Sequence, residues 1–149
     1  IATSARYGAR FGGATPEVEE ALTAYGEIVG SAFQLSDDIL DIASESGESG
    51  KTPGTDLREG VPTLPVLMAL ASTDPADARL HELLAGDLTD DDRHAEALRL
   101  LRAHPALGQA RDYVVNQARE AKAHLAAVPA GPVRDALEAF ADLVAVRSS

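Results

Sequence analysis

The sequence contains no cysteine and no tryptophan, and aromatic residues make up only 4% of its 149 positions. The absence of cysteine excludes disulfide bonds, thiolate metal ligands and thiol catalysis, and it fits a reducing compartment. Long apolar runs are also missing, so no segment reaches the length of a membrane span, and the N-terminus lacks the pattern of a secretory signal. From these absences we expect a cytoplasmic protein without a transmembrane segment.

Positive charge is scarce, because 13 Lys and Arg face 24 Asp and Glu, which gives a net charge of −11. A nucleic-acid partner is therefore disfavoured, since too few cations are present to neutralise a phosphate backbone. An acidic protein can still bind a diphosphate if metal ions bridge the two negative partners. With 45% hydrophobic and 25% charged residues, the chain has the composition of one globular domain.

Alanine and leucine dominate the sequence and no segment alternates between apolar and polar residues, which predicts an all-α fold. A first helix is expected to end near Gly12 and a second to follow Thr15, with Pro16 in its first turn, and to run to about Ile42. Residues 44–60 are rich in Gly, Ser and Thr and predict a loop. Later helices are expected to start after Thr63, Asp74, Thr89, His104 and Gly131.

Three aspartates lie near the expected end of the long second helix, in the sequence FQLSDDILD at residues 33–41. Asp37, Asp38 and Asp41 have the spacing i, i+1, i+4 and therefore share one face of a helix. Such a face repels itself unless a cation lies in front of it, and Mg²⁺ binds carboxylate oxygens together with substrate phosphates. A solvated acidic helix end is the alternative. Because the helix dipole disfavours negative charge at a C-terminal end, a metal-diphosphate site in a cleft explains the cluster better.

A second acidic run, Asp90–Asp92, follows Thr89 at an expected helix start, where the dipole favours negative charge, so we interpret it as capping. In the loop, Lys51 could bring an ammonium group to a phosphate, although a solvated loop lysine is the more common case. Asp56 could orient metal-bound water or cap a turn. The four histidines lack metal-ligand spacing and are interpreted as surface or helix-end residues: His81, His94, His104 and His124.

The pattern FQxxDDxxD followed by GKxxGxDLxxGxxTLP, within residues 33–65, resembles the second aspartate-rich region of the trans-isoprenyl (polyprenyl) diphosphate synthases. Outside these residues the similarity depends on helix spacing and small residues. The resemblance implies that residues 1–149 are the C-terminal portion of one all-α, isoprenoid-synthase-type helical bundle, without the first aspartate-rich motif. It also implies a homodimer, and this portion alone is expected to be inactive.

The same resemblance assigns roles to individual residues. It implies that Asp37 is a direct metal ligand and that Asp38 and Asp41 also belong to the metal site and its water. Gln34 and Lys51 are implied as the catalytic, diphosphate-binding residues.

Asp56 would lie in the second shell of the metal. The pattern departs from the family at Val61, where many members carry a lysine after the glycine, and we interpret this as variation within a subfamily.

The expected function is a prenyl transfer that condenses isopentenyl diphosphate with an allylic diphosphate to give a linear polyprenyl diphosphate. Mg²⁺ is the implied cofactor, which assists departure of the diphosphate. Two alternatives stay open. A non-catalytic helical partner subunit of a synthase would be favoured by an upstream sequence without an aspartate-rich motif. A terpene cyclase is less favoured, because cyclases usually replace the second aspartate triad with an Asn/Asp-Ser/Thr-Glu motif.

Overall fold

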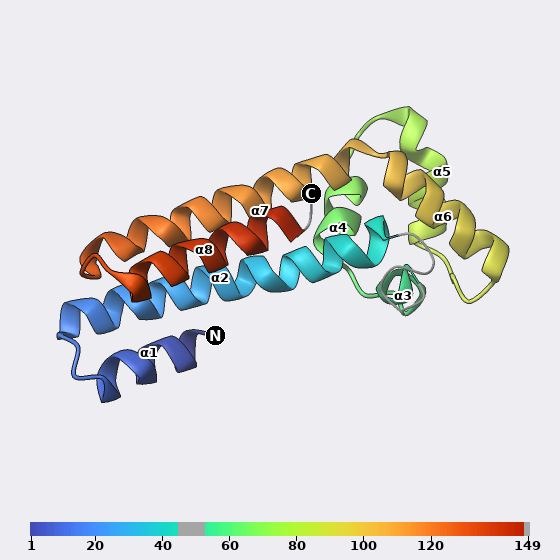
Figure 1. The fold of residues 1–149 in the computed structure, drawn as a ribbon. Helices are drawn as coiled ribbons and strands as arrows, with labels where there is room; N and C mark the ends of the chain where they lie inside the picture. The colour runs from blue at the N-terminus through green and yellow to red at the C-terminus, as the bar shows by residue number, and fades with distance from the viewer. Residues whose placement is uncertain (45–52, 148–149) are drawn as a thin grey trace. The chain divides into compact units, whose positions relative to one another are not determined.

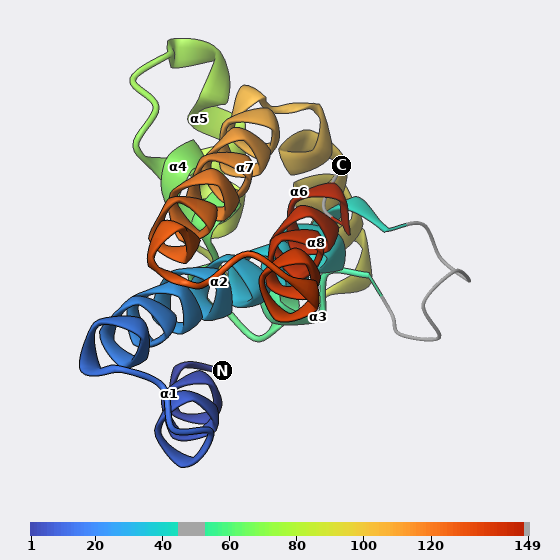
Figure 2. The same ribbon diagram turned by 60° about the vertical axis from the view of Figure 1, so that its left-hand side comes forward.

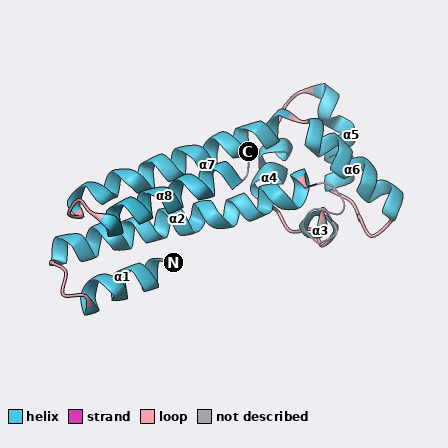
Figure 3. Ribbon diagram, in the orientation of Figure 1, coloured by secondary structure: helices cyan, strands magenta, loops and turns pink. Residues whose placement is uncertain are grey.

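The computed structural model describes residues 1–44 and 53–147. Helices and their connecting loops make up these two ranges, which contain no strand (Figure 3), so the expected all-α fold is confirmed. In chain order the elements are α1 (Ala2–Phe11), α2 (Pro16–Ala43), α3 (Thr55–Arg58), α4 (Leu64–Leu70), the 3₁₀ helix η1 (Pro75–Asp77), α5 (Ala78–Leu84), α6 (Asp91–Ala103), α7 (Pro105–His124), the 3₁₀ helix η2 (Leu125–Ala127) and α8 (Pro132–Arg147).

Most helix boundaries follow the sequence signals, and α2 is the clearest case. Pro16 is its first residue, and the Val18 N–H donates to the Thr15 hydroxyl oxygen at 3.4 Å, which is a long capping bond. The helix is 28 residues long and ends at Ala43, one residue beyond the expected end. Its last turn contains no basic residue. The negative end of the helix dipole therefore has no compensating charge from α2 itself.

Two expectations about boundaries are wrong. Residues 44–60 were expected to form a loop throughout, but α3 occupies part of this range. The N-cap of α6 is Asp90 rather than Thr89, because the Asp90 carboxylate accepts the Arg93 N–H at 3.0 Å. The hydroxyl and N–H of Thr89 instead donate to Asp87, each at 2.9 Å. The interpretation of the acidic run as a helix cap is nevertheless confirmed.

The helices form two compact units, residues 1–36 with 113–149 and residues 37–112, and the boundaries fall inside α2 and α7. In the first unit α1, α2, α7 and α8 pack lengthwise (Figures 1 and 2). The buried Tyr25 of α2 donates its hydroxyl hydrogen to the Leu137 carbonyl of α8 at 2.7 Å. Gly26 allows α1 to approach closely, because a Cβ at this position would lie 2.7 Å from the Ala2 Cα.

The second unit contains α3 to α6 and the adjoining ends of α2 and α7. Its core includes the buried Leu57, Val66, Leu83 and Leu101. α5 and α6 are joined by the Arg79 guanidinium, which donates to both carboxylate oxygens of Glu96 at 3.0 and 2.6 Å. This unit holds the three aspartates of the sequence motif.

Several large apolar side chains are exposed, including Phe11 at 86%, Val146 at 67% and Val133 at 66%. Within the ranges given above, no helix combines the length and the apolarity needed to cross a membrane.

Candidate functional site

The C-terminal end of α2 presents the aspartates with the predicted helical register. Ile39 and Ile42 are fully buried, at 0% and 1% exposure, whereas Asp37, Asp38 and Asp41 are half-buried. The apolar positions therefore attach this end of α2 to the core of the second unit, and the acids occupy the more accessible side.

Two other predicted site residues are placed differently. Gln34 lies one helical turn before Asp38 in the sequence, is exposed, and belongs to the part of α2 in the first unit. Lys51 lies outside the described residues.

Asp41 binds the backbone of residues 54–56, the return segment. One carboxylate oxygen accepts the Thr55 N–H and the other accepts the Asp56 N–H, each at 3.1 Å. The Asp41 carbonyl accepts the Gly54 N–H at 2.7 Å. Because the first N–H groups of a helix have no partner within it, the Asp41 carboxylate caps α3 from a distant position in the sequence. A carboxylate has about four lone-pair sites, so these two bonds leave acceptor capacity on Asp41.

The surroundings of Asp41 disfavour its negative charge. Burial raises the pKa of the Asp41 carboxyl, and the nearby Asp56 carboxylate also raises it, whereas the hydrogen bonds from the Asp56 and Thr55 backbones oppose the rise. A carboxylate in this condition gains more from a nearby cation than a fully solvated one does.

His94 of α6 also binds the return segment. Its Nε2 lies 2.8 Å from the Gly54 carbonyl oxygen, which can only accept, so Nε2 carries the hydrogen. His94 is 5% exposed and is therefore not a surface residue, but it lies in the first turn of α6, which agrees with the expected position at a helix end. Gly54 has φ of +73°, and a Cβ there would lie 2.7 Å from the His94 Nε2, so the contact requires glycine.

Arg102, also on α6, binds the end of α2. Its Nε donates to the Ile42 carbonyl at 2.7 Å and one terminal nitrogen donates to the Ser44 carbonyl. These are carbonyl groups that a helix end leaves without internal partners, and the guanidinium places positive charge at the negative end of the dipole. Sequence reasoning missed both α6 residues. Arg102 is 60 positions from Ile42 and His94 is 40 from Gly54, so no local spacing reveals them.

The donor set fits Mg²⁺ only in part. Across residues 1–44 and 53–147, no group of three or more His, Asp or Glu side chains is arranged to hold a metal. However, Mg²⁺ usually takes one or two protein carboxylates and completes its octahedral shell with water and phosphate oxygens. Asp37 and Asp38 therefore suit this ion when a diphosphate supplies further ligands, and they do not form a cage by themselves.

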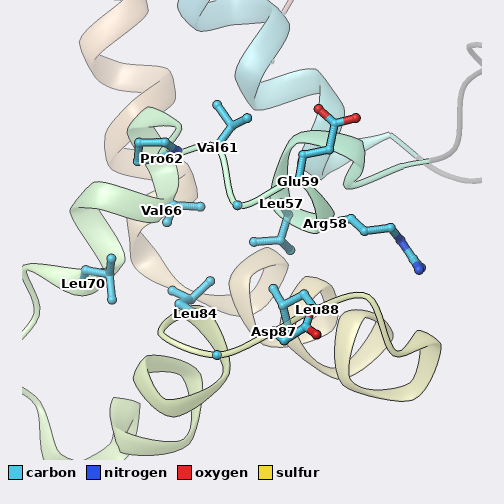
Figure 4. A pocket seen from close by; sticks show the side chains of 12 residues that line it. Leu57, Arg58, Glu59, Val61, Pro62, Val66, Leu70, Leu84, Asp87 and Leu88 are labelled. Atoms are coloured by element: carbon cyan, nitrogen blue, oxygen red, sulfur yellow. The ribbon is translucent and has the colours of Figure 1, made fainter.

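A cavity of about 260 Å³ lies elsewhere in the second unit, and no motif aspartate lines it. Figure 4 shows Leu57, Leu84 and Leu88 directed towards one another from α3, α5 and the loop before α6. Arg58, at the edge, donates to the Thr89 carbonyl at 3.0 Å. The lining is largely apolar, it includes Glu59 and Asp87, which would repel a diphosphate, and Arg58 is already paired with Asp91, so this cavity is a poor diphosphate site.

The family model described as Polyprenyl synthetase matches residues 1–101. The chain belongs to this family. The resemblance seen in the aspartate motif is thereby confirmed, and with it the all-α class that solved polyprenyl synthetase relatives share. Arg102 lies one position beyond the matched residues.

Relatives align with almost all of this chain. It is 50% identical over 147 residues, 99% of its length, to a nonaprenyl diphosphate synthase of Mycobacterium tuberculosis, of which it spans 44%. It is 32% identical over 147 residues to decaprenyl-diphosphate synthase subunit 1 of Schizosaccharomyces pombe, covering 99% of this chain and 38% of that protein.

Among solved structures, geranylgeranyl pyrophosphate synthase of Corynebacterium glutamicum, complexed with calcium and isoprenyl diphosphate, matches with a TM-score of 0.89 and 40% identity. The match covers 99% of this chain and 46% of that one. The chain thus spans less than half the length of these relatives.

Proposed function

We propose that this chain supplies the second aspartate-rich motif of a synthase that condenses isopentenyl diphosphate with an allylic diphosphate into a linear polyprenyl diphosphate. The observation that carries the proposal is the register of Asp37 and Asp38 on a buried helix end, in a chain of the polyprenyl synthetase family. Two neighbouring half-buried carboxylates are suited to a divalent cation shared with a diphosphate. The allylic diphosphate is the substrate that this motif would hold.

Asp37 and Asp38 are the residues that would hold Mg²⁺, with Asp41 contributing through its remaining lone pairs. When bound, the ion supplies positive charge to the diphosphate as it leaves. The carbon–oxygen bond of the allylic diphosphate breaks and a carbon–carbon bond forms with the double bond of isopentenyl diphosphate. The proton lost at the end is taken up by the released diphosphate, so no protein base is required.

The other predicted site residues have supporting roles in this proposal. Asp41 holds the return segment in place, because its carboxylate accepts hydrogen bonds from the Thr55 and Asp56 N–H groups. The Asp56 carboxyl would orient metal-bound water. Lys51 would donate to the diphosphate and Gln34 would line the substrate, as the resemblance implies.

The assembly that we propose is a cytoplasmic homodimer without a nucleic-acid partner. The mass of the purified protein in solution, measured by light scattering, tests the dimer.

The experiment uses the intact polypeptide that contains this sequence, an allylic primer and isopentenyl diphosphate, with and without Mg²⁺, and reads product length by mass spectrometry. The variant Asp37→Asn/Asp38→Asn is expected to lose at least about a hundredfold in turnover, because even partners outside a metal's ligand shell contribute roughly 10–100-fold. The control Glu17→Gln/Glu20→Gln removes the same charge from exposed positions on the same helix and should keep its activity.

Equal activity in both variants would contradict the metal-binding role of the motif. No product from the folded wild-type protein, alone, would support the second candidate, a non-catalytic partner subunit. The observation that favours the partner-subunit candidate is the name of the S. pombe relative, which is called a subunit of a synthase. Adding a catalytic subunit would then restore synthesis.

A further inference from the structure

We propose that α6 positions the aspartate motif through two residues, Arg102 and His94, which act on the reaction without contacting the substrate. This inference rests on the proposed function and deepens it, since it assigns to a helix outside the motif the task of fixing the metal-binding carboxylates. The evidence is a set of contacts within the second unit.

The first contact fixes the end of α2. Asp37 and Asp38 lie in the last two turns of this helix, and the last turn is the part that frays most easily because its carbonyl groups lack partners. Arg102 bonds to the Ile42 and Ser44 carbonyls, and thus holds the backbone directly after the motif. Its charge also opposes the combined repulsion of the acids and the negative helix end, for which α2 offers no basic residue.

The second contact fixes the return segment. His94 donates to the Gly54 carbonyl at 2.8 Å, and Gly54 donates to the Asp41 carbonyl at 2.7 Å. The next two N–H groups bind the Asp41 carboxylate. A series of hydrogen bonds therefore connects His94 of α6, through Gly54, to Asp41 of the motif. All three residues are buried or half-buried.

Both anchoring residues lie on one helix, eight positions apart, at Asp91–Ala103. α6 is itself fixed to the core of the unit by the buried Ala97, Leu98 and Leu101. A rigid helix of this kind defines the separation between the end of α2 and the start of α3 better than local contacts alone. A metal site needs such support, because ligands that move lose affinity.

The first experiment compares Arg102→Ala, Arg102→Lys and the control Arg99→Ala in the intact polypeptide. The Arg99 side chain is exposed on the same helix, and its charge acts only electrostatically on Glu96, which is not part of the motif. In Arg102→Ala the Mg²⁺ concentration for half-maximal activity should rise about tenfold, and Arg102→Lys should restore part of this loss because it keeps the charge. Arg99→Ala should match the wild type.

Hydrogen–deuterium exchange without metal provides a readout independent of activity. Arg102→Ala should speed exchange at residues 41–44, and His94→Leu should speed it at the Gly54, Thr55 and Asp56 amides. His94→Gln, which retains a donor near the position of Nε2, should restore protection. Exchange in α5 should stay unchanged in all variants.

An unchanged Mg²⁺ requirement together with unchanged local exchange would overturn the inference. Faster exchange throughout residues 53–112 with an unchanged Mg²⁺ requirement would also overturn it, because α6 would then only stabilise the fold. Failure of the proposed function has a different signature, namely no synthesis by the wild type while the local exchange differences persist.

Discussion

Replacing Gly54 with alanine should destabilise the second unit far more than the same replacement at Gly60. Both glycines have the left-handed backbone conformation, with φ of +73° and +72°, so both variants bear the backbone cost of about 1–2 kcal/mol. The surroundings differ. A Cβ at Gly54 would lie 2.7 Å from the His94 Nε2 and 3.1 Å from its Cε1, whereas nothing lies within 4 Å of a Cβ at Gly60.

The expected magnitude follows from these distances. The His94 ring cannot retreat without losing its bond to the Gly54 carbonyl, and a buried polar group without its partner costs about 1–3 kcal/mol. The predicted loss in free energy of unfolding is therefore about 2–5 kcal/mol for Gly54→Ala and about 1–2 kcal/mol for Gly60→Ala. Urea titration of the intact polypeptide, followed by circular dichroism, measures both. Equal losses in the two variants would refute the reasoning, since the His94 contact would then contribute nothing.

Two further predictions concern other parts of the chain. Tyr25→Phe should lower the free energy of unfolding by about 1 kcal/mol, because it removes the hydrogen bond to the α8 backbone. Burial raises the pKa of Tyr25 from 10.0 to about 12, so the stability from its neutral form is complete below pH 10 and is lost as the pH rises towards 12. Between pH 10 and 12 the urea midpoint of the wild type should fall, and that of the Phe variant should fall less. An equal fall in both proteins would contradict this. For Asp77, the Ser72 hydroxyl and then His104 hold the pKa below 3.8, so its stabilisation is present above that pH and is lost as the pH falls through the lower folded value. Asp77→Asn should therefore be less stable than the wild type at neutral pH, and the difference should shrink as the pH falls below 3.8 through the lowered folded value; a constant difference would exclude the electrostatic cause.

The sequence predicted those features that local chemistry determines. The start of α2 at Pro16 and the shared, more accessible side of its three motif aspartates both follow from residues within a few positions of one another. The acidic run at the start of α6 was also interpreted correctly as a cap, and the capping residue is Asp90. The family was recognisable because its motif is contiguous.

The contacts that hold the motif could not be predicted in this way. Asp41 caps α3 from 14 and 15 positions away, and the mostly polar sequence around α3 gave no sign of this. His94 carries no spacing signal, and its contact with Gly54 joins positions 40 residues apart. The role of Lys51 stays a prediction, because the residue lies outside the described ranges. That Asp37, Asp38 and Gln34 bind metal or substrate also stays a prediction.

The attachment of α2 to α6 changes what would have to be transplanted to build this motif into another helical protein. A graft of residues 33–65 would include the whole sequence motif. It would lack Arg102 and His94, which donate hydrogen bonds to the carbonyls of Ile42, Ser44 and Gly54. Residues 37–112, the second unit, include both donors and the helix that presents them. For protein engineering the transferable part is therefore this unit together with residues 33–36 of α2, which add Gln34, and such a chimera should keep the geometry that a shorter insert would lose.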